Sequence, residues 1–210
     1  MSYRIKQLNT GALAVNTWLV INTEEKKAVV IDPGGDADYI LRIAKESGAT
    51  LTAILLTHCH FDHIGGVCEL VRIADIPVYA HIETARLINT NANLAEMMFG
   101  LEALPITVNH TFMDGETLDI AGFPFQVIHT PGHSADSCCF LLENFLFTGD
   151  TLFFRSVGRV DLPTGNAATL LASLREKVFT LPEELVCYPG HGEKTTLRSE
   201  KKNNPYLAGF

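Results

Sequence analysis

The sequence predicts a layered α/β protein whose sheets mix parallel and antiparallel strands. Short apolar runs typical of strands recur along all 210 residues, and several are apolar on both faces, as in strands that are covered on two sides. Helical segments interrupt these runs early, midway and late in the chain. Turn pairs at Asp114-Gly115 and Ala121-Gly122 indicate hairpins, so part of the sheet system should be antiparallel.

The predicted strands are short runs rich in β-branched and aromatic residues, with turn residues between them. In order along the chain they cover residues 4–8, 14–21, 27–32, 52–57, 77–80, 125–130, 138–142, 145–150 and 185–190. The stretch "MDGETLDIAGFPFQVI", which contains both turn pairs, is expected to fold as hairpins.

Four segments show the apolar spacing of helices. Asp36 is expected to cap a helix over residues 37–47 that ends at Gly48. Asn166 is expected to cap another over 167–179, with one apolar stripe formed by Leu170, Leu171, Leu174 and Val178. Residues 64–74 and 81–100 also have a helical pattern.

Length and charge narrow the class of protein. A hydrophobic content of 47% suits a globular protein, and residues 1–210 are expected to form one domain. A formal net charge of -8 argues against nucleic acids or anionic membranes as partners, because both require a basic surface. With no long apolar run and no signal peptide at its start, the chain is expected to be cytoplasmic. Its five cysteines are odd in number, which indicates reduced thiols.

Side chains of the kind that bind metals follow several predicted strands. The runs "VIHTPGH", "FLFTGD" and "LVCYPGH" end in a glycine turn and then deliver His133, Asp150 and His191. The run "TAILLT" is followed by a cluster of four such side chains: His58, His60, Asp62 and His63. Binding sites of α/β sheets collect at strand ends, and glycine lets the backbone approach a ligand closely. The four strand ends are therefore expected to converge on one site.

Seven ligands are enough for two metal ions. His58 and His60 are two residues apart, so in extended backbone they project to one side and can hold one ion together with His133. The second ion would take Asp62, His63 and His191, and Asp150 would lie between the two. Imidazole and carboxylate ligands suit zinc, iron and manganese, so the ligand types alone leave the metal open.

Other polar residues near the strand ends have simpler interpretations. Cys59 lies between two ligands and should point away from them by strand alternation. Asp32 in "VVIDPGG" is either a turn residue or a hydrogen-bond partner of a metal-binding histidine. The remaining histidines, His81, His110 and His129, are interpreted as ordinary hydrogen-bonded residues.

The motifs "THCHFDHIGG", "HTPGH", "FTGD" and "YPGHG" resemble those of the metallo-β-lactamase superfamily, in the same order and over essentially the whole chain. The resemblance implies a four-layer αββα sandwich with the metal site at one edge between the sheets. Asp150 stands where the zinc lactamases of the family commonly have cysteine, and "SVGRVDLPTGN" is similar to a loop of small, single-domain glyoxalase II-like proteins. The chain departs from long glyoxalase II enzymes, which have an additional C-terminal helical domain with glutathione-binding residues. It also has "HTPGHSADS" in place of "HTPGHTPG".

The resemblance implies a hydrolase that holds two divalent metal ions, with zinc as the first candidate and iron or manganese as alternatives. The expected reaction is attack of a metal-bridging hydroxide on a small thioester such as a hydroxyacylglutathione. Asp62 and Asp150 would position the water and tune its acidity. Candidate substrate contacts on the loop after Asp150 are Phe153, Phe154, Arg155 and Arg159, although Arg159 can equally form a salt bridge with Asp161.

Three other functions are alternatives to the hydrolase. Iron-dependent persulfide dioxygenases share these motifs, and their single iron site would map onto His58, His133 and Asp150. The ending "PGHGEKTT" favours the hydrolases, since the dioxygenases tend to have Ala before that histidine and Asp after it. Nucleases of the superfamily usually carry RNA-binding insertions for which an acidic chain of this length has no room. A metal-binding or sensor module without enzymatic activity would need a coordination shell that protein ligands fill completely. The sequence leaves the oligomeric state open.

Overall fold

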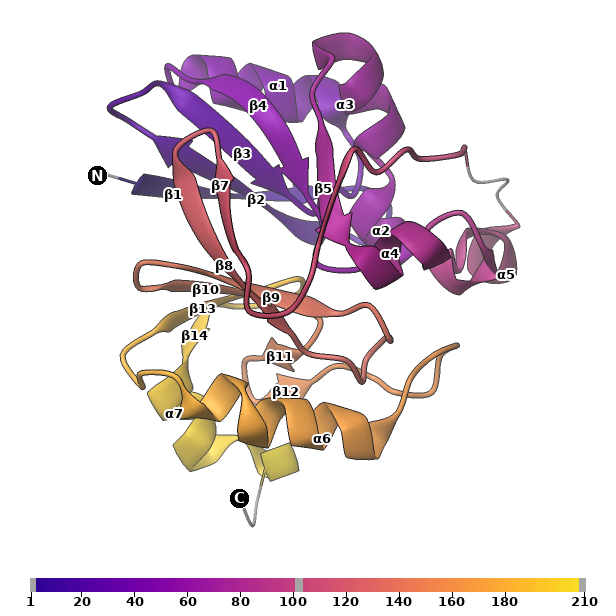
Figure 1. The fold of residues 1–210 in the computed structure, drawn as a ribbon, viewed down its shortest axis with the longest axis vertical. Helices are drawn as coiled ribbons and strands as arrows, with labels where there is room; N and C mark the ends of the chain where they lie inside the picture. The colour runs from indigo at the N-terminus through magenta and orange to yellow at the C-terminus, as the bar shows by residue number, and fades with distance from the viewer. Residues whose placement is uncertain (1–2, 101–103, 208–210) are drawn as a thin grey trace.

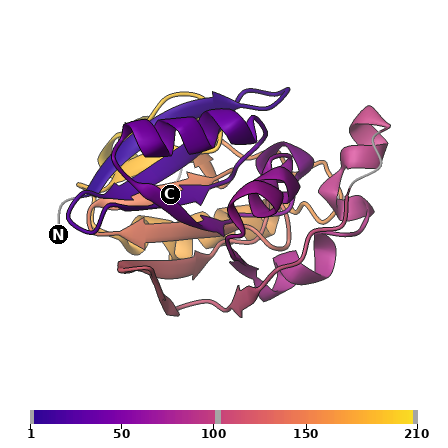
Figure 2. The same ribbon diagram turned by 90° about the horizontal axis from the view of Figure 1, so that it is seen from above.

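The computed structural model describes residues 3–100 and 104–207. Two six-stranded sheets stack face to face, with helices on both outer surfaces, as Figure 1 shows and Figure 2 shows from above. The four-layer αββα arrangement expected from the sequence is confirmed.

The first sheet contains the N-terminal half of the chain. Its order is β1 (Tyr3–Thr10), β2 (Val15–Asn22), β3 (Lys27–Ile31), β4 (Thr50–Leu55), β5 (Val78–His81) and β6 (His110–Phe112). The first three strands are antiparallel, and β3 to β6 run parallel. All eight residues of β2 are buried, because both faces of this strand are covered.

The second sheet contains the C-terminal half. Its order is β14 (Thr195–Thr196), β13 (Val186–Pro189), β10 (Phe145–Gly149), β9 (Cys138–Leu142), β8 (Phe123–His129) and β7 (Thr117–Ile120). Only β10 and β13 among these described strands are parallel neighbours. A separate two-stranded hairpin, β11 (Leu152–Phe153) and β12 (Ser156–Val157), follows β10.

Helices cover the outer faces of the sheets and the connection between them. They are α1 (Ala37–Glu46), α2 (Phe61–Ile64), α3 (Val67–Ala74), α4 (Ile82–Leu87), α5 (Ala95–Phe99), α6 (Ala167–Glu176) and α7 (Leu197–Asn203), with short 3-10 turns η1 (Asn91–Asn93), η2 (Val178–Thr180) and η3 (Pro205–Leu207). Within the described ranges, no helix combines the length and apolar character required to cross a membrane.

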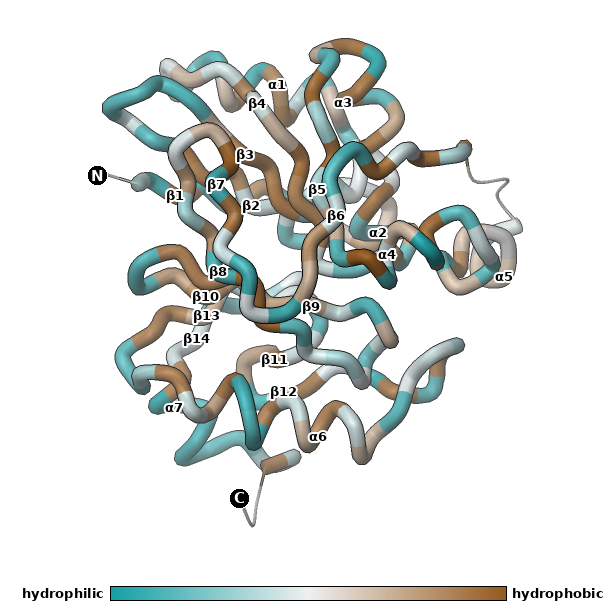
Figure 3. Tube along the Cα trace, viewed as in Figure 1, coloured by the Kyte–Doolittle hydropathy of each residue, from teal (hydrophilic) through white to brown (hydrophobic). Residues whose placement is uncertain are grey.

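Three hydrophobic clusters lie between the layers, and hydrophobic residues are frequent along the strands (Figure 3). The first lies between α1, α3 and the first sheet, and the third lies between the second sheet, α6 and α7. The middle cluster joins the two sheets and contains five fully buried phenylalanines: Phe112, Phe123, Phe125, Phe140 and Phe147. Burial of each such side chain contributes about 1.5–3 kcal/mol to folding.

The predicted helix cap at Asn166 is confirmed, but the predicted cap at Asp36 is wrong. The Asn166 side chain accepts a hydrogen bond from the Thr169 amide at 2.9 Å, as an N-cap does. Asp36 also precedes a helix, but its φ of 55° turns the side chain away. Its carboxylate accepts instead from the Gly11 amide at 2.9 Å, so it ties the β1–β2 turn to the start of α1.

Two further expectations need correction. Ala121-Gly122 does form a hairpin, between β7 and β8, but the chain crosses from one sheet to the other at Asp114-Gly115. On α6 and the η2 turn, Leu170, Leu174 and Val178 are buried, whereas Leu171, which was predicted to belong to the same stripe, is 37% exposed and lies outside the buried face.

Two of the predicted helices are each divided into shorter elements. The predicted helix over 64–74 is divided at Gly65 and Gly66, which pack directly against the backbone of Gly34 and Gly35. The segment 81–100 is broken into α4, η1 and α5. All five cysteines are free, as predicted.

Candidate metal centre

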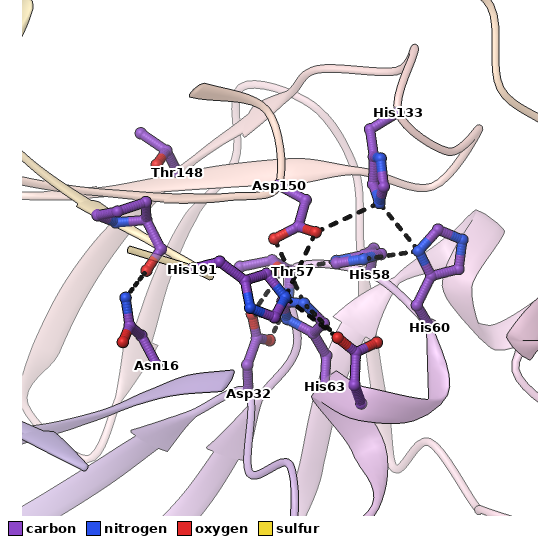
Figure 4. A network of polar contacts seen from close by, with 12 residues as sticks. Asn16, Asp32, Thr57, His58, His60, His63, His133, Thr148, Asp150 and His191 are labelled. Atoms are coloured by element: carbon purple, nitrogen blue, oxygen red, sulfur yellow. Dashed lines mark hydrogen bonds and ion pairs between the residues drawn. The ribbon is translucent and has the colours of Figure 1, made fainter. Parts of the chain in front are cut away.

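Side chains from four loops meet at one edge of the sandwich, between the two sheets (Figure 4). The loops follow β4, β8, β10 and β13, and they deliver the seven predicted ligands to one place. These seven are His58, His60, Asp62, His63, His133, Asp150 and His191.

Three histidines form the first group. Nδ1 of His60 lies 3.0 Å from Nε2 of His58 and 2.9 Å from Nε2 of His133. All three rings are buried. Their inward nitrogens are therefore close enough together to share one ion.

The second group combines a carboxylate with two histidines. Oδ2 of Asp62 lies 3.1 Å from Nε2 of His191 and 3.7 Å from Nε2 of His63. His63 is fully buried, whereas Asp62 and His191 are partly exposed on the open side of the site.

Asp150 joins the two groups. Its Oδ1 lies 3.3 Å from Nε2 of His63, in the second group. Its Oδ2 lies 3.5 Å from Nε2 of His133, in the first group, and 3.8 Å from Nε2 of His191. One carboxylate thus faces both sets of donors, as Figure 4 shows.

Hydrogen bonds to the outward-facing nitrogens of the histidine rings determine which of the other nitrogens can bind a cation. Nδ1 of His133 lies 2.7 Å from the carbonyl oxygen of Arg159, which only accepts, so this nitrogen carries the proton. Nδ1 of His58 lies 3.0 Å from the Thr57 hydroxyl, and that hydroxyl donates to Asp32 at 2.6 Å. His58 therefore also carries a proton on its outer nitrogen, and the inward Nε2 atoms of both rings are left to face the centre of the site.

Asp32 has the same effect on His63. Its Oδ2 lies 2.9 Å from Nδ1 of His63, and its Oδ1 accepts from the Thr57 amide at 2.8 Å. The backbone of Asp32 also has a φ of 52°, typical of a turn residue. Asp32 is therefore both a turn residue and a hydrogen-bond partner of His63, the two interpretations that the sequence offered. The inward Nε2 of His63 is left facing the carboxylates of Asp62 and Asp150.

The charges of the site favour a cation. Burial lowers the pKa of His60 to about 3, and its neighbour His133 adds to the shift. Burial would also lower the pKa of His63, but the carboxylates of Asp150 and Asp62 outweigh it and raise that pKa well above the usual range. Burial would raise the pKa of Asp150, but His63 outweighs burial and lowers it. Negative charge is therefore in excess near His63.

Buried polar atoms without partners show that the donor set fits metal ions. Nε2 of His63 and Oδ1 of Asp150 are both buried, and although they face each other at 3.3 Å, the two atoms do not meet the geometry of a hydrogen bond. Leaving such groups unpaired costs about 1–3 kcal/mol each. A divalent cation would satisfy both of them and would also accept the lone pairs of the first group.

The backbone near His191 approaches the site as closely as glycine allows. A Cβ atom on Gly190 would lie 2.3 Å from Oδ1 of Asp150 and 2.6 Å from Cε1 of His63. Asn16 holds this loop, since its side chain donates to the carbonyls of Pro189 at 3.0 Å and Gly192 at 2.8 Å. No motif in the sequence marks Asn16, because this residue is far from the ligand motifs along the chain.

Cys59 points away from the ligands, as predicted, and packs in the hydrophobic cluster under α1 and α3. Its amide donates to Oδ2 of buried Asp136 at 2.9 Å, which holds the turn between His58 and His60. Asp136 belongs to the unusual "HSADS" stretch, but its contact with this turn was not expected from the sequence.

A pocket of about 350 Å³ opens beside the cluster. Of the four predicted substrate contacts, Phe153 and Arg159 line it, and Phe154 and Arg155 do not. Arg155 has a φ of 55° at the turn between β11 and β12, and its guanidinium donates to the carbonyl of Asn203, away from the pocket. The structure therefore brings only two of the four residues to the site.

Comparisons with known proteins show what the chain is similar to. The sequence model of the Metallo-beta-lactamase superfamily matches residues 10–191. The probable metallo-hydrolase YqgX of Bacillus subtilis is 37% identical over 208 residues, 98% of each chain. Hydroxyacylglutathione hydrolase GloC of Haemophilus influenzae is 33% identical over 188 residues, 88% of this chain and 89% of that protein.

Solved structures show the same fold. BLEG-1, described as a B3 metallo-beta-lactamase, is 39% identical with a TM-score of 0.90, over 98% of this chain and 100% of that one. TTHA1623 in a di-iron-bound form is 39% identical with a TM-score of 0.85, over 96% and 100%. ETHE1 from Myxococcus xanthus is 32% identical with a TM-score of 0.82, over 100% and 85%.

Proposed function

The chain belongs to the metallo-β-lactamase superfamily, and on this premise we propose that it is a hydrolase that uses two divalent metal ions to cleave a small thioester, such as a hydroxyacylglutathione. The observation that carries the proposal is the position of Asp150, whose two oxygens face different groups of metal-binding side chains. The hydroxyacylglutathione hydrolase GloC is a relative of this chain, which supports the thioester as substrate.

Metal ions held by the seven side chains would lower the pKa of a water molecule to about 7 and polarise the substrate carbonyl. The chain's own residues position these groups. Asp32, Thr57 and the Arg159 carbonyl orient three of the histidine rings through their outer nitrogens. The partly exposed side chains of Asp62 and His191 line the pocket together with His60, His133 and Asp150. A thiolate leaves readily, so the reaction needs no strong general acid.

Persulfide dioxygenation is the second candidate, and a specific likeness favours it. The chain is similar to ETHE1 over its full length, and His58, His133 and Asp150 provide the two-histidine, one-carboxylate set of a single iron site. Iron is also the metal in the similar structure of TTHA1623. The two reactions differ in their need for oxygen, which separates them experimentally.

Hydrolysis of β-lactams is a third activity to be tested, because BLEG-1 is described as a metallo-beta-lactamase. Amide hydrolysis needs help for a poor nitrogen leaving group, whereas a thioester does not. We therefore expect a clear preference for thioesters.

The deciding experiment combines metal analysis with parallel assays on one preparation. Zinc- and iron-loaded forms are assayed on lactoylglutathione, on glutathione persulfide with an oxygen electrode, and on a chromogenic cephalosporin. Two metals per chain and oxygen-independent thioester cleavage are the expected result. One iron per chain with oxygen consumption would replace the hydrolase with the dioxygenase. Bound metal without any turnover would favour a sensor, and a cephalosporin kcat/KM at or above that of the thioester would favour a lactamase.

A further inference from the structure

The pocket beside the metal-binding cluster has a polar end and an apolar remainder. The polar end is made by the ligand side chains, including Asp62, His133 and His191. The remaining walls come from separate segments of the chain and present seven apolar side chains: Leu13, Phe61, Leu94, Met98, Phe153, Val157 and Leu162. A substrate group that lies next to the reacting centre is thus surrounded by hydrocarbon.

The pocket offers no free positive charge. Among the described residues that line it, Arg159 carries the only Lys or Arg side chain. Its guanidinium forms a two-bond salt bridge with Asp161, with Nε–Oδ1 at 2.7 Å and Nη2–Oδ2 at 2.8 Å. The charge of Arg159 is therefore already balanced by a neighbour on the same loop.

We propose that this pocket binds the acyl group of the substrate as an uncharged, apolar chain, while the thiol carrier extends into solvent. The inference rests on the proposed thioester hydrolase. A volume of about 350 Å³ is at the small end of ligand pockets, which suits an acyl chain rather than a whole peptide thioester. The carboxylates and ammonium of glutathione would lose hydration there without gaining partners.

Two series of thioesters test the proposal: acetyl, butyryl and hexanoyl esters of N-acetylcysteamine, which is uncharged, and the same esters of glutathione. Each buried methylene should raise kcat/KM about 3- to 4-fold until the pocket is full. The chain-length profile should be the same for both carriers. A flat profile, or an advantage of glutathione of more than about 10-fold at every chain length, would overturn the proposal.

A matched pair of variants locates the effect. Phe153 lines the pocket, whereas the adjacent Phe154 is 45% exposed and lies outside it. Phe153→Ala should raise the KM for the hexanoyl ester about 10-fold and leave the acetyl ester nearly unchanged. Phe154→Ala should leave both KM values nearly unchanged. Equal effects of the two substitutions would contradict the proposal, and circular dichroism of both variants checks that they fold.

Binding without turnover separates this proposal from the proposed function. S-alkyl thioethers of N-acetylcysteamine cannot be hydrolysed, and calorimetry on the metal-loaded protein measures their affinity. If affinity rises with alkyl length while no thioester is cleaved, the result supports the apolar acyl pocket and contradicts the proposed hydrolase function. Cleavage of thioesters together with thioether affinity that is independent of length would do the reverse.

Discussion

The carboxylate of Asp32 lies 2.9 Å from Nδ1 of His63, and both side chains are buried in the same hydrogen-bonded group. The same carboxylate also accepts from the amide and the hydroxyl of Thr57. Asp32 thereby orients two neighbouring candidate ligands, His63 directly and His58 through Thr57.

Asp32→Asn tests this role. Asparagine tolerates the positive φ of this position but replaces one accepting oxygen with an NH₂ group, which cannot accept from His63 or Thr57. Metal affinity should fall about 10- to 100-fold, as measured by competition with a chelator. Asp36→Asn is the matched control, since Asp36 also has a positive φ but binds only a surface amide. Unchanged metal affinity in Asp32→Asn would show that this contact does not orient a ligand.

Asp150→Asn should lose activity far more than it loses the fold. The amide keeps the shape of the side chain but removes the negative charge that faces both groups of donors. We expect the metal content to drop from two ions and turnover to fall by more than about 100-fold. Elemental analysis, turnover and circular dichroism are measured together, with exposed Asp119→Asn as the control. Turnover near that of the unsubstituted protein would exclude Asp150 as a ligand.

Cys59→Ser should keep the metals and most of the activity. The thiol is buried under the helical layer beside Asp136, away from His58 and His60, and burial, with Asp136, raises its pKa. The hydroxyl is more strongly hydrated than the thiol in the unfolded chain, so burying it should lower the melting temperature while metal content stays the same. Metal loss with an intact fold would place the thiol among the ligands.

Acid should weaken the start of helix α4. His81 is buried, its Nδ1 accepts from the Glu83 amide at 3.3 Å, and its ring stacks on His129 at 4.1 Å. Burial, and then His129, lower the pKa of His81, although Glu83, Asp136 and Asp114 act against the shift. The unfolded chain therefore binds this proton more readily than the folded one. The stabilisation is present above about pH 6.5 and is lost as the pH falls through the folded pKa.

The variant His81→Asn keeps a capping side chain that does not titrate in this range. The midpoint of urea unfolding, measured between pH 7.5 and pH 5, should fall less steeply with acid in this variant than in the unsubstituted protein. Identical slopes would show that His81 does not contribute to the pH dependence of stability.

Glu200 links the C-terminal helix α7 to the hairpin that carries Phe153. Its fully buried carboxylate accepts from the Arg155 amide and the Asn204 side chain, both at 2.9 Å, and from the Thr195 hydroxyl at 2.5 Å. Glu200→Gln removes the negative charge from these hydrogen bonds and turns an NH₂ group toward the Thr195 hydroxyl, and it should cost about 1–3 kcal/mol of unfolding free energy. KM should rise more than kcat falls, because the pocket wall loosens while the metal ligands stay in place.

Exposed Glu184→Gln, which loses only a surface ion pair with Arg198, is the control and should unfold like the unsubstituted protein. A Glu200→Gln protein with the same stability and the same KM would show that the hairpin does not depend on this carboxylate.

Local spacing predicted much of the fold and the ligand set. Strand content, the Asn166 cap and the hairpin at Ala121-Gly122 depend on neighbours in the chain, and all are found in the structure. The hairpin predicted at Asp114-Gly115 is wrong, because a turn signal in the sequence does not show which strand the next strand will pair with. Long-range pairing decided that the chain crosses between sheets at this turn.

The sequence by itself determined which side chains meet at the metal-binding cluster. These side chains follow strand ends directly, and the four strands, which belong to two stacked sheets, end at the same edge of the sandwich. Only the tertiary structure decided which ring nitrogens face inward, because Asp32, the Thr57 hydroxyl and the Arg159 carbonyl reach the rings across separate loops. The pocket was likewise decided by packing, since Leu13 and Leu162 become neighbours of the site only when distant segments are brought together. Such contacts depend on the whole fold, and no short spacing in the sequence encodes them.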